Sequence, residues 1–205
     1  VVDNASTDGS RDYLEPKFKN TCFTWNTENI GFGKACNQAL KHASGEYILF
    51  LNPDTVVPED CFDACISFFK QTANAGALGI RMLDGSGKFL PESKRSFPSP
   101  ATSFFKLSGL SYLFPHSKTF GRYHLGYLNE HQNHEVDVLA GAFMMIPKKV
   151  LDQVGGFDES FFMYGEDIDL SYRIEKAGVK NYYLADTTII HYKGESTKKG
   201  SLNYV

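Results

Sequence analysis

The stretch that decides the fold is Tyr47-Ile48-Leu49-Phe50-Leu51-Asn52-Pro53-Asp54. Its first five residues are almost wholly apolar, which is typical of a central strand that is covered on both faces. The next three residues are polar and turn-forming, and they end the strand at a carboxylate. Because ligands bind beyond the carboxyl ends of the strands in an open α/β sheet, the stretch predicts a buried strand and a binding edge together.

Short apolar runs and helical patterns alternate on both sides of this strand. Further strands are expected at residues 1–2, 22–25, 77–82, 136–146, 180–184 and 187–192. Apolar residues recur at helical spacing in residues 35–43, 62–69 and 170–177. This alternation is typical of βα units, and it predicts an α/β fold with a mixed, mainly parallel sheet flanked by helices.

The chain of 205 residues, 42% of them hydrophobic, is long enough for one domain with a substantial core. We expect a single domain over residues 1–195 and a mobile tail at residues 196–205. The chain opens within an apparent strand and without a Met, so we also expect that N-terminal residues are missing.

Residues 91–135 are expected to form an irregular insertion, because four prolines break the periodicity there. An aromatic and aliphatic run at residues 104–114 leaves three interpretations open: core packing, a homodimer contact, or a peripheral membrane contact. The membrane interpretation depends on the neighbouring basic residues Lys94, Arg95 and Lys106.

Composition excludes several functional classes. A formal net charge of −3 and an estimated pI of 6.1 argue against a nucleic-acid partner. No apolar run approaches the ~20 residues of a membrane-spanning helix. The cysteines are scattered and lack a metal-binding or disulfide pattern, which favours a reducing, cytosolic setting.

Three polar clusters follow strands or precede helices, and we expect them to line one crevice. They lie at residues 3–10, 29–33 and 52–54. Asp3 is suited to accept hydrogen bonds from a base or ribose, and Gly31 and Gly33 would let backbone amides approach phosphate. The alternatives are an Asx-turn or helix cap at Asp3 and an ordinary strand-to-helix loop at the glycines.

Asp54 is a candidate metal ligand. A carboxylate at the mouth of a buried strand is the oxygen ligand that divalent cations such as Mg²⁺ and Mn²⁺ prefer, and such a cation would bridge a diphosphate. The alternative is a helix cap, but Asp54 precedes the expected helix by several residues. His191, at the end of an expected strand, could complete the metal shell or could be structural.

The run Phe161-Phe162-Met163-Tyr164-Gly165-Glu166-Asp167-Ile168-Asp169 places three carboxylates at a helix start, after aromatic residues. Like charges this close shift one another's pKa values, and an apolar wall raises them further. Glu166 and Asp167 are therefore candidates for a general base. The alternative, surface acids that stabilise a helix N-terminus, suits Asp169.

Taken in order, these segments resemble those of glycosyltransferase family 2, in particular its bacterial rhamnosyltransferase-like branch, over nearly the whole chain. The matching segments are Val1-Val2-Asp3-Asn4-Ala5-Ser6-Thr7-Asp8-Gly9-Ser10, Glu28-Asn29-Ile30-Gly31-Phe32-Gly33, Asn52-Pro53-Asp54, Gly141-Ala142-Phe143, Gly156-Phe157-Asp158-Glu159 and Phe161 through Asp169. The resemblance implies a GT-A fold whose first strand and helix would precede Val1 and form one wall of the nucleotide site.

The resemblance also implies roles for individual residues. Asp3 would contact the nucleobase, Gly31 and Gly33 would lie near the ribose and diphosphate, and Asp167 would be the base. Asp54 would hold a divalent cation, with His191 as a further ligand. The donor-binding set implied in this way is Asp3, Asn4, Asn29, Gly31, Gly33, Asn52 and Asp54. Asn52 stands where a full DXD motif has its first acid, so the cation has one carboxylate fewer.

The activity implied is an inverting transfer of a sugar from a nucleoside-diphosphate-sugar to a saccharide or lipid-linked saccharide, in cell-surface polysaccharide synthesis. The branch suggests rhamnose carried on deoxythymidine diphosphate. The expected location is the cytoplasm, including the inner face of the plasma membrane. A non-catalytic nucleotide-sugar-binding domain is the alternative. A Rossmann oxidoreductase is set aside because the loop at residues 31–33 lacks the third glycine of GxGxxG.

Overall fold

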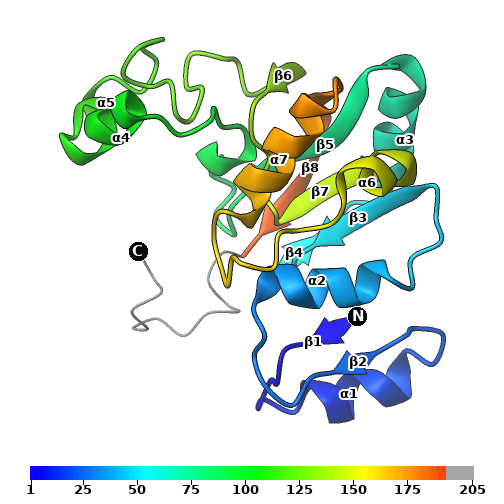
Figure 1. Cartoon of the computed structure of the whole chain (residues 1–205). Helices are drawn as coiled ribbons and strands as arrows, with labels where there is room; N and C mark the ends of the chain where they lie inside the picture. The colour runs from blue at the N-terminus through cyan, green and yellow to red at the C-terminus, as the bar shows by residue number, and fades with distance from the viewer. Residues whose placement is uncertain (193–205) are drawn as a thin grey trace.

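The computed structural model describes residues 1–192, which form two sheets and the helices around them (Figure 1). A small parallel sheet pairs β1 (Val2–Asp3) with β2 (Thr24–Trp25), and α1 (Ser10–Lys17) connects these two strands. In Figure 1, α2 (Phe32–Leu40) lies between this small sheet and the larger one.

The larger sheet has six strands. The order along its main path is β3 (Tyr47–Leu51), β7 (Phe143–Pro147), β5 (Ala75–Leu83), β8 (Lys180–His191) and β4 (Thr55–Val56). The sixth strand, β6 (His134–Val136), pairs with the first part of β8. Only the β5–β8 pairing is parallel among the strand pairs described for this sheet.

Helices cover both faces of the larger sheet and create two apolar cores. One core joins the sheet to α2, α6 (Lys148–Val154) and α7 (Glu166–Lys176), and the other joins it to α3 (Cys61–Gln71). Strand β3 contributes Ile48 and Phe50 to the first core, while Tyr47 and Leu49 pack against the second. The predicted burial of this strand on both faces is therefore confirmed, as is the α/β class with a mixed sheet flanked by helices.

Four expectations about the strands are wrong. The larger sheet is not mainly parallel, and β3 lies at the end of its pairing order rather than at its centre. Residues 136–146 form two strands separated by a buried loop, and residues 180–192 contain one long strand with a register shift instead of two strands. Apolar sequence indicates burial, but it does not distinguish a buried loop from a strand or identify the pairing partner.

The insertion at residues 91–135 contains a 3₁₀ turn, η1 (Pro91–Ser93), and two short helices, α4 (Pro100–Leu107) and α5 (Leu110–Leu113). A capping box between Ser99 and Thr102 starts α4, with Pro100 at its first position. In Figure 1, α4 and α5 project from the sheet at the upper left. No helix within residues 1–192 is long and apolar enough to cross a bilayer. The predicted mobile tail, residues 196–205, lies outside the described residues.

Candidate active site

The turn at Gly141-Ala142 lies between the Asn52-Pro53-Asp54 turn and the Glu166-Asp167 pair. The backbone amide of Asn52 donates a hydrogen bond to the carbonyl of Ala142 over 3.0 Å, which fixes the start of the Asn52-Pro53-Asp54 turn. On the other side, a Cβ atom placed on Gly141 would lie 3.8 Å from Cβ of Asp167. The structure therefore brings the turn after β3 and the first turn of α7 to one end of the sheet.

Asp54 and His191 are in contact. Strand β4 pairs with the end of β8, so that Thr55 lies opposite His191, and Nε2 of His191 is 3.2 Å from Oδ1 of Asp54. Both side chains are buried, at 9% exposure for His191 and 8% for Asp54. Nδ1 of His191 is also buried and has no hydrogen-bond partner within the described residues. A buried carboxylate beside an imidazole nitrogen is a set of ligands that fits a divalent cation.

Asp167 is the second residue of α7, and both of its carboxylate oxygens are held. Oδ2 accepts a hydrogen bond from Nη2 of Arg95 at 2.5 Å, and Oδ1 accepts one from the backbone amide of Ile168 at 2.8 Å. Burial lowers the pKa of Arg95, but the attraction of Asp167 and the hydrogen bond between them raise it above its ordinary value. A permanent positive charge therefore stands beside the predicted base.

Glu166, the first residue of α7, lies in a different environment. It is 6% exposed, and its Oε2 has no hydrogen-bond partner within residues 1–192. Burial raises the pKa of Glu166. Burial, and then the charge of Glu166, raises the pKa of Cys36 in α2 to about 12. Glu166 therefore faces the interior near α2, whereas Asp167 faces Arg95, so the two acids predicted as catalytic are not equivalent.

Asp169 is a structural acid. Its Oδ2 is 2.7 Å from Nη2 of Arg173, one turn later in α7. Arg173 also donates hydrogen bonds to the carbonyls of Val154 and Gly156, which ties α7 to the end of α6. The alternative interpretation of Asp169 as a stabiliser of the helix start agrees with this position.

The loop after β1 is hydrogen-bonded to the loop before α2. Oδ2 of Asp3 accepts a hydrogen bond from the amide of Ser6 at 2.9 Å, which is the turn left open as an alternative role for this residue. Nδ2 of Asn4 donates to the carbonyl of Gly31 at 3.0 Å, and Oδ1 of Asn29 accepts from the amide of Gly31 at 3.0 Å. These contacts place the predicted donor-binding residues of the two loops side by side.

The two glycines of the second loop allow the segment before α7 to approach. Gly31 has a φ of 90°, and a Cβ atom there would lie 2.6 Å from the carbonyl oxygen of Phe162. The amide of Phe32 donates to that same oxygen at 3.0 Å. A Cβ atom on Gly33 would lie 3.2 Å from Cβ of Phe157. Close packing thus requires both glycines, and their contact with a diphosphate stays a prediction.

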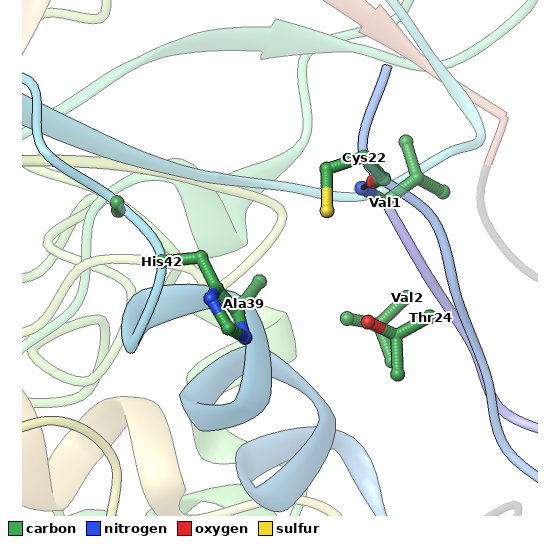
Figure 2. A pocket seen from close by; sticks show the side chains of 7 residues that line it. Val1, Val2, Cys22, Thr24, Ala39 and His42 are labelled. Atoms are coloured by element: carbon green, nitrogen blue, oxygen red, sulfur yellow. Dashed lines mark hydrogen bonds between the residues drawn. The ribbon is translucent and has the colours of Figure 1, made fainter.

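A hollow of about 160 Å³ lies between the small sheet and α2 (Figure 2). Its lining is mostly apolar and consists of Val1, Val2, Cys22, Thr24, Ala39, His42 and Ala43. The hollow is smaller than the roughly 300 Å³ at which small-molecule sites begin, and none of the predicted site residues lines it. We therefore do not assign the donor to it.

Solved structures with this fold include nucleotide-sugar transferases. The mannosyltransferase PcManGT of Pyrobaculum calidifontis, in complex with GDP-Man and Mn²⁺, superposes with a TM-score of 0.61 at 18% identity, over 96% of this chain and 48% of that one. TarS 1–349 of S. aureus, in complex with UDP-GlcNAc, gives 0.61 at 21% identity, over 95% and 50%. These similarities show that the fold is the GT-A fold of glycosyltransferases.

Residues 1–155, more than half of the sequence, match the family described as Glycosyl transferase family 2. The chain belongs to this family and is a glycosyltransferase, as the sequence predicts. Residues 122–195 also match the N-terminal domain of galactosyltransferase.

Two relatives are rhamnosyltransferases. The N-acetylglucosaminyl-diphospho-decaprenol L-rhamnosyltransferase of Mycobacterium tuberculosis is 29% identical over 100% of this chain and 69% of its own length. Rhamnosyltransferase WbbL of Escherichia coli is 31% identical over 79% of this chain and 61% of its own length. They confirm the resemblance to this branch of the family and the predicted class, a glycosyltransferase of surface polysaccharide synthesis.

Arg95 is the site residue that the sequence analysis missed. In the sequence it stands with Lys94 and Lys106 as a basic residue near the apolar run of the insertion, but its side chain is 12% exposed and lies against Asp167. An isolated bridge between Arg95 and Val138 brings it there. A pairing between segments so far apart leaves no local pattern, so only the structure reveals this neighbour.

Proposed function

We propose that this chain catalyses an inverting transfer of a sugar, with rhamnose as the first candidate, from a nucleoside-diphosphate-sugar to a lipid-linked saccharide. The observation that carries the proposal is that the Gly141-Ala142 turn lies against both acidic motifs: Ala142 accepts a hydrogen bond from Asn52, two residues before Asp54, and Gly141 lies beside Asp167. In this proposal Asp54 acts at the leaving diphosphate, and Asp167 acts on the acceptor. We also propose that residues 1–195 act as one catalytic domain.

Asp167 is the proposed base. Its carboxylate takes the proton from an acceptor hydroxyl, while that oxygen attacks the anomeric carbon from the face opposite the diphosphate, so the configuration inverts. Each carboxylate oxygen can accept two hydrogen bonds, and one site on each is used by Arg95 or Ile168. The remaining sites leave room for the acceptor hydroxyl, and the two fixed contacts orient the carboxylate toward it.

Asp54 and His191 are the proposed ligands of a divalent cation, Mn²⁺ or Mg²⁺. When bound, the cation neutralises the charge that develops on the departing diphosphate. Within residues 1–192, no group of three or more His, Cys, Asp or Glu side chains is arranged for a metal ion. Two protein ligands, of which one is a carboxylate, would leave the rest of the coordination shell to the substrate phosphates and water.

The donor is proposed to lie against the loops at residues 3–10 and 29–33. Support comes from the hydrogen bonds that join Asn4 and Asn29 to Gly31, since they hold the two loops together next to the start of α7. Asn52 would line the same crevice from the turn after β3. The names of the relatives suggest a rhamnose donor and a polyprenyl-diphosphate-linked acceptor. Such an acceptor would place the enzyme in the cytoplasm, at the inner face of the plasma membrane.

The test combines donor binding with turnover. Thermal stabilisation of the chain is measured with a panel of nucleotide-sugars, with and without Mn²⁺, and release of nucleoside diphosphate is measured with the donor that binds. We expect deoxythymidine-diphosphate rhamnose with Mn²⁺ to give the largest stabilisation. Asp167→Asn should retain that stabilisation and lose turnover by at least about a hundredfold.

Asp169→Asn is the matched control, because it makes the same change two residues later in α7. It should affect stability more than turnover, since Asp169 pairs with Arg173. Near-normal turnover in Asp167→Asn would remove Asp167 from the role of base. A loss of donor binding in that variant would instead indicate a role in the donor site.

A further inference from the structure

The two helices of the insertion project from the sheet (Figure 1). They expose large apolar side chains. Within α4 and α5 and directly after them, five such residues are more than half exposed, and Leu107 and Tyr112 reach 89% and 87%. We call this surface the hairpin patch, and its residues are Phe104, Leu107, Tyr112, Leu113 and Phe114. Clustered exposed apolar residues of this size mark an interaction surface.

A small aromatic cluster joins the helices of the hairpin patch to the segment that follows them. The ring of Phe120 packs edge-to-face on Phe105, with 5.1 Å between centroids, and lies 5.7 Å from the ring of Phe114. Gly109, with a φ of 78°, makes the tight turn between the two helices. These contacts join α4, α5 and the segment after them into one hairpin that carries the exposed side chains.

The segment that carries the hairpin patch has charges of one sign. Residues 93–129 contain five basic residues and no Asp or Glu, whereas the rest of the chain carries a formal net charge of −8. Lys94 is buried and donates to the carbonyl of Leu125, and Arg95 pairs with Asp167, so neither contributes to the surface. The basic residues exposed near the hairpin patch are Lys106, Lys118 and Arg122.

We infer that the hairpin patch docks on the surface of an anionic phospholipid bilayer. Apolar side chains that enter the interface and cations that remain among the headgroups are the two signals that together give stable peripheral binding. The positive charge also distinguishes a membrane from a second copy of the chain. A symmetric dimer through the hairpin patch would bring Lys106, Lys118 and Arg122 of both copies together and cause repulsion. The inference does not depend on the proposed function, because docking needs no substrate.

The test is co-sedimentation of the full chain with vesicles of phosphatidylcholine alone and of phosphatidylcholine mixed with phosphatidylglycerol. We expect binding to the mixed vesicles, weak binding to the neutral ones, and a loss of binding as salt is raised. The double variant Leu107→Ser, Leu113→Ser should weaken binding by about tenfold or more. Replacing Lys106, Lys118 and Arg122 by Glu should weaken binding to the mixed vesicles by at least about fivefold for each cation removed.

Two control variants match these changes elsewhere on the surface. Phe18→Ser with Phe62→Ser removes two exposed apolar side chains, and reversal of Lys19, Lys41 and Lys70 to Glu makes the same change in net charge. Both controls should bind the mixed vesicles within about twofold of the parent chain. Circular dichroism and thermal unfolding show that each variant is folded before its binding is interpreted.

Three outcomes would overturn the inference. They are equal binding to both kinds of vesicle, equal losses in the hairpin and control variants, and no binding to vesicles at all. Analytical ultracentrifugation is run in parallel. A dimer that the Leu107→Ser, Leu113→Ser variant abolishes, without vesicle binding by the parent chain, would assign the hairpin patch to a second copy instead.

Discussion

Nη2 of Arg95 lies 2.5 Å from Oδ2 of Asp167, and this contact joins the start of the insertion to the first turn of α7. The two side chains are 12% and 15% exposed, so water screens their attraction only in part. Arg95 is held in turn by the bridge between its backbone and Val138 and by a hydrogen bond from its Nη2 to the carbonyl of Leu139. The proposed base thus has its orientation fixed by a residue outside its own helix.

Arg95→Met should lower both stability and turnover. The change leaves Asp167 as a partly buried charge without its partner, and such changes typically cost about 3 to 5 kcal/mol. Denaturant unfolding gives the stability, and kcat and KM for the donor separate orientation of the base from binding. We expect kcat to fall by at least about tenfold while KM changes little, with partial rescue in Arg95→Lys, which keeps the charge.

Arg81→Met is the matched control for this variant, because Arg81 forms a comparable ion pair with Glu130 at 2.6 Å. It should destabilise the chain without lowering kcat in the same proportion. In the double variant Arg95→Met, Asp167→Asn, no unpaired carboxylate remains, so the stability losses should be less than additive. Strict additivity would show that the two side chains are not coupled.

The contact between Asp54 and His191 predicts how the chain responds to Mn²⁺. In the presence of a nucleoside diphosphate, Mn²⁺ should raise the thermal midpoint of the parent chain, and EDTA should reverse the shift. Asp54→Asn should abolish the response, and His191→Gln should reduce it, because each removes one ligand from the pair. A full response to Mn²⁺ in both variants would place the cation elsewhere.

Local patterns in the sequence predicted much of the fold. The apolar run at residues 47–51, the helix after Gly165 and the strand at residues 77–82 are all present, because burial and capping are encoded by neighbouring residues. Strand pairing was not predictable in the same way. It depends on contacts between distant segments, and this explains why a mainly parallel sheet was expected and a mostly antiparallel one is found.

In the candidate site, too, local patterns identify some features and contacts between distant segments decide the others. Asp54, Glu166 and Asp167 could be selected from the sequence because each stands at the end of a strand or the start of a helix. The different environments of Glu166 and Asp167 could not be predicted from the sequence. Glu166 is buried near α2, and Asp167 is paired with Arg95. Likewise, only the structure removes Arg95 from the basic surface of the insertion.

Gly31→Ala should damage the contact between the loop at residues 29–33 and the segment before α7. The residue has a φ of 90° and a ψ of 163°, which side chains rarely allow, and its new methyl group would meet the carbonyl of Phe162. We expect a loss of about 3 kcal/mol in unfolding free energy and a higher KM for the donor. Gly87→Ala is the control. Its φ is 85° and it has open space around it, so only the backbone cost of about 1 kcal/mol applies.

Equal losses at the two glycines would contradict the contact with Phe162. The unfolding free energies come from denaturant titrations. Donor KM values are measured in the same buffer, so that a change in the loop can be separated from a change in global stability.

Glu166→Gln should make the chain more stable at neutral pH, even though it changes a residue at the candidate active site. Burial raises the pKa of Glu166 above its ordinary value of 4.5, so the folded protein holds this proton over a pH range in which the unfolded chain has released it. The contribution of Glu166 to stability is complete below about pH 4.5 and is lost as pH rises through the raised pKa. Each unit between the two pKa values corresponds to about 1.4 kcal/mol.

The advantage of Glu166→Gln over the parent chain should therefore appear above pH 4.5, grow toward neutral pH and vanish in acid. Asp8→Asn should show the opposite pattern. The hydrogen bond from the Ser10 side chain, and then that from the Ser10 amide, lowers the pKa of Asp8, so removing its charge costs stability at neutral pH and little in acid. Denaturant unfolding of both variants between acid and neutral pH measures the two differences. A stability difference for Glu166→Gln that is constant with pH would mean that the carboxyl group ionises as easily in the folded chain as in the unfolded one, and would refute its placement in the apolar interior beside α2.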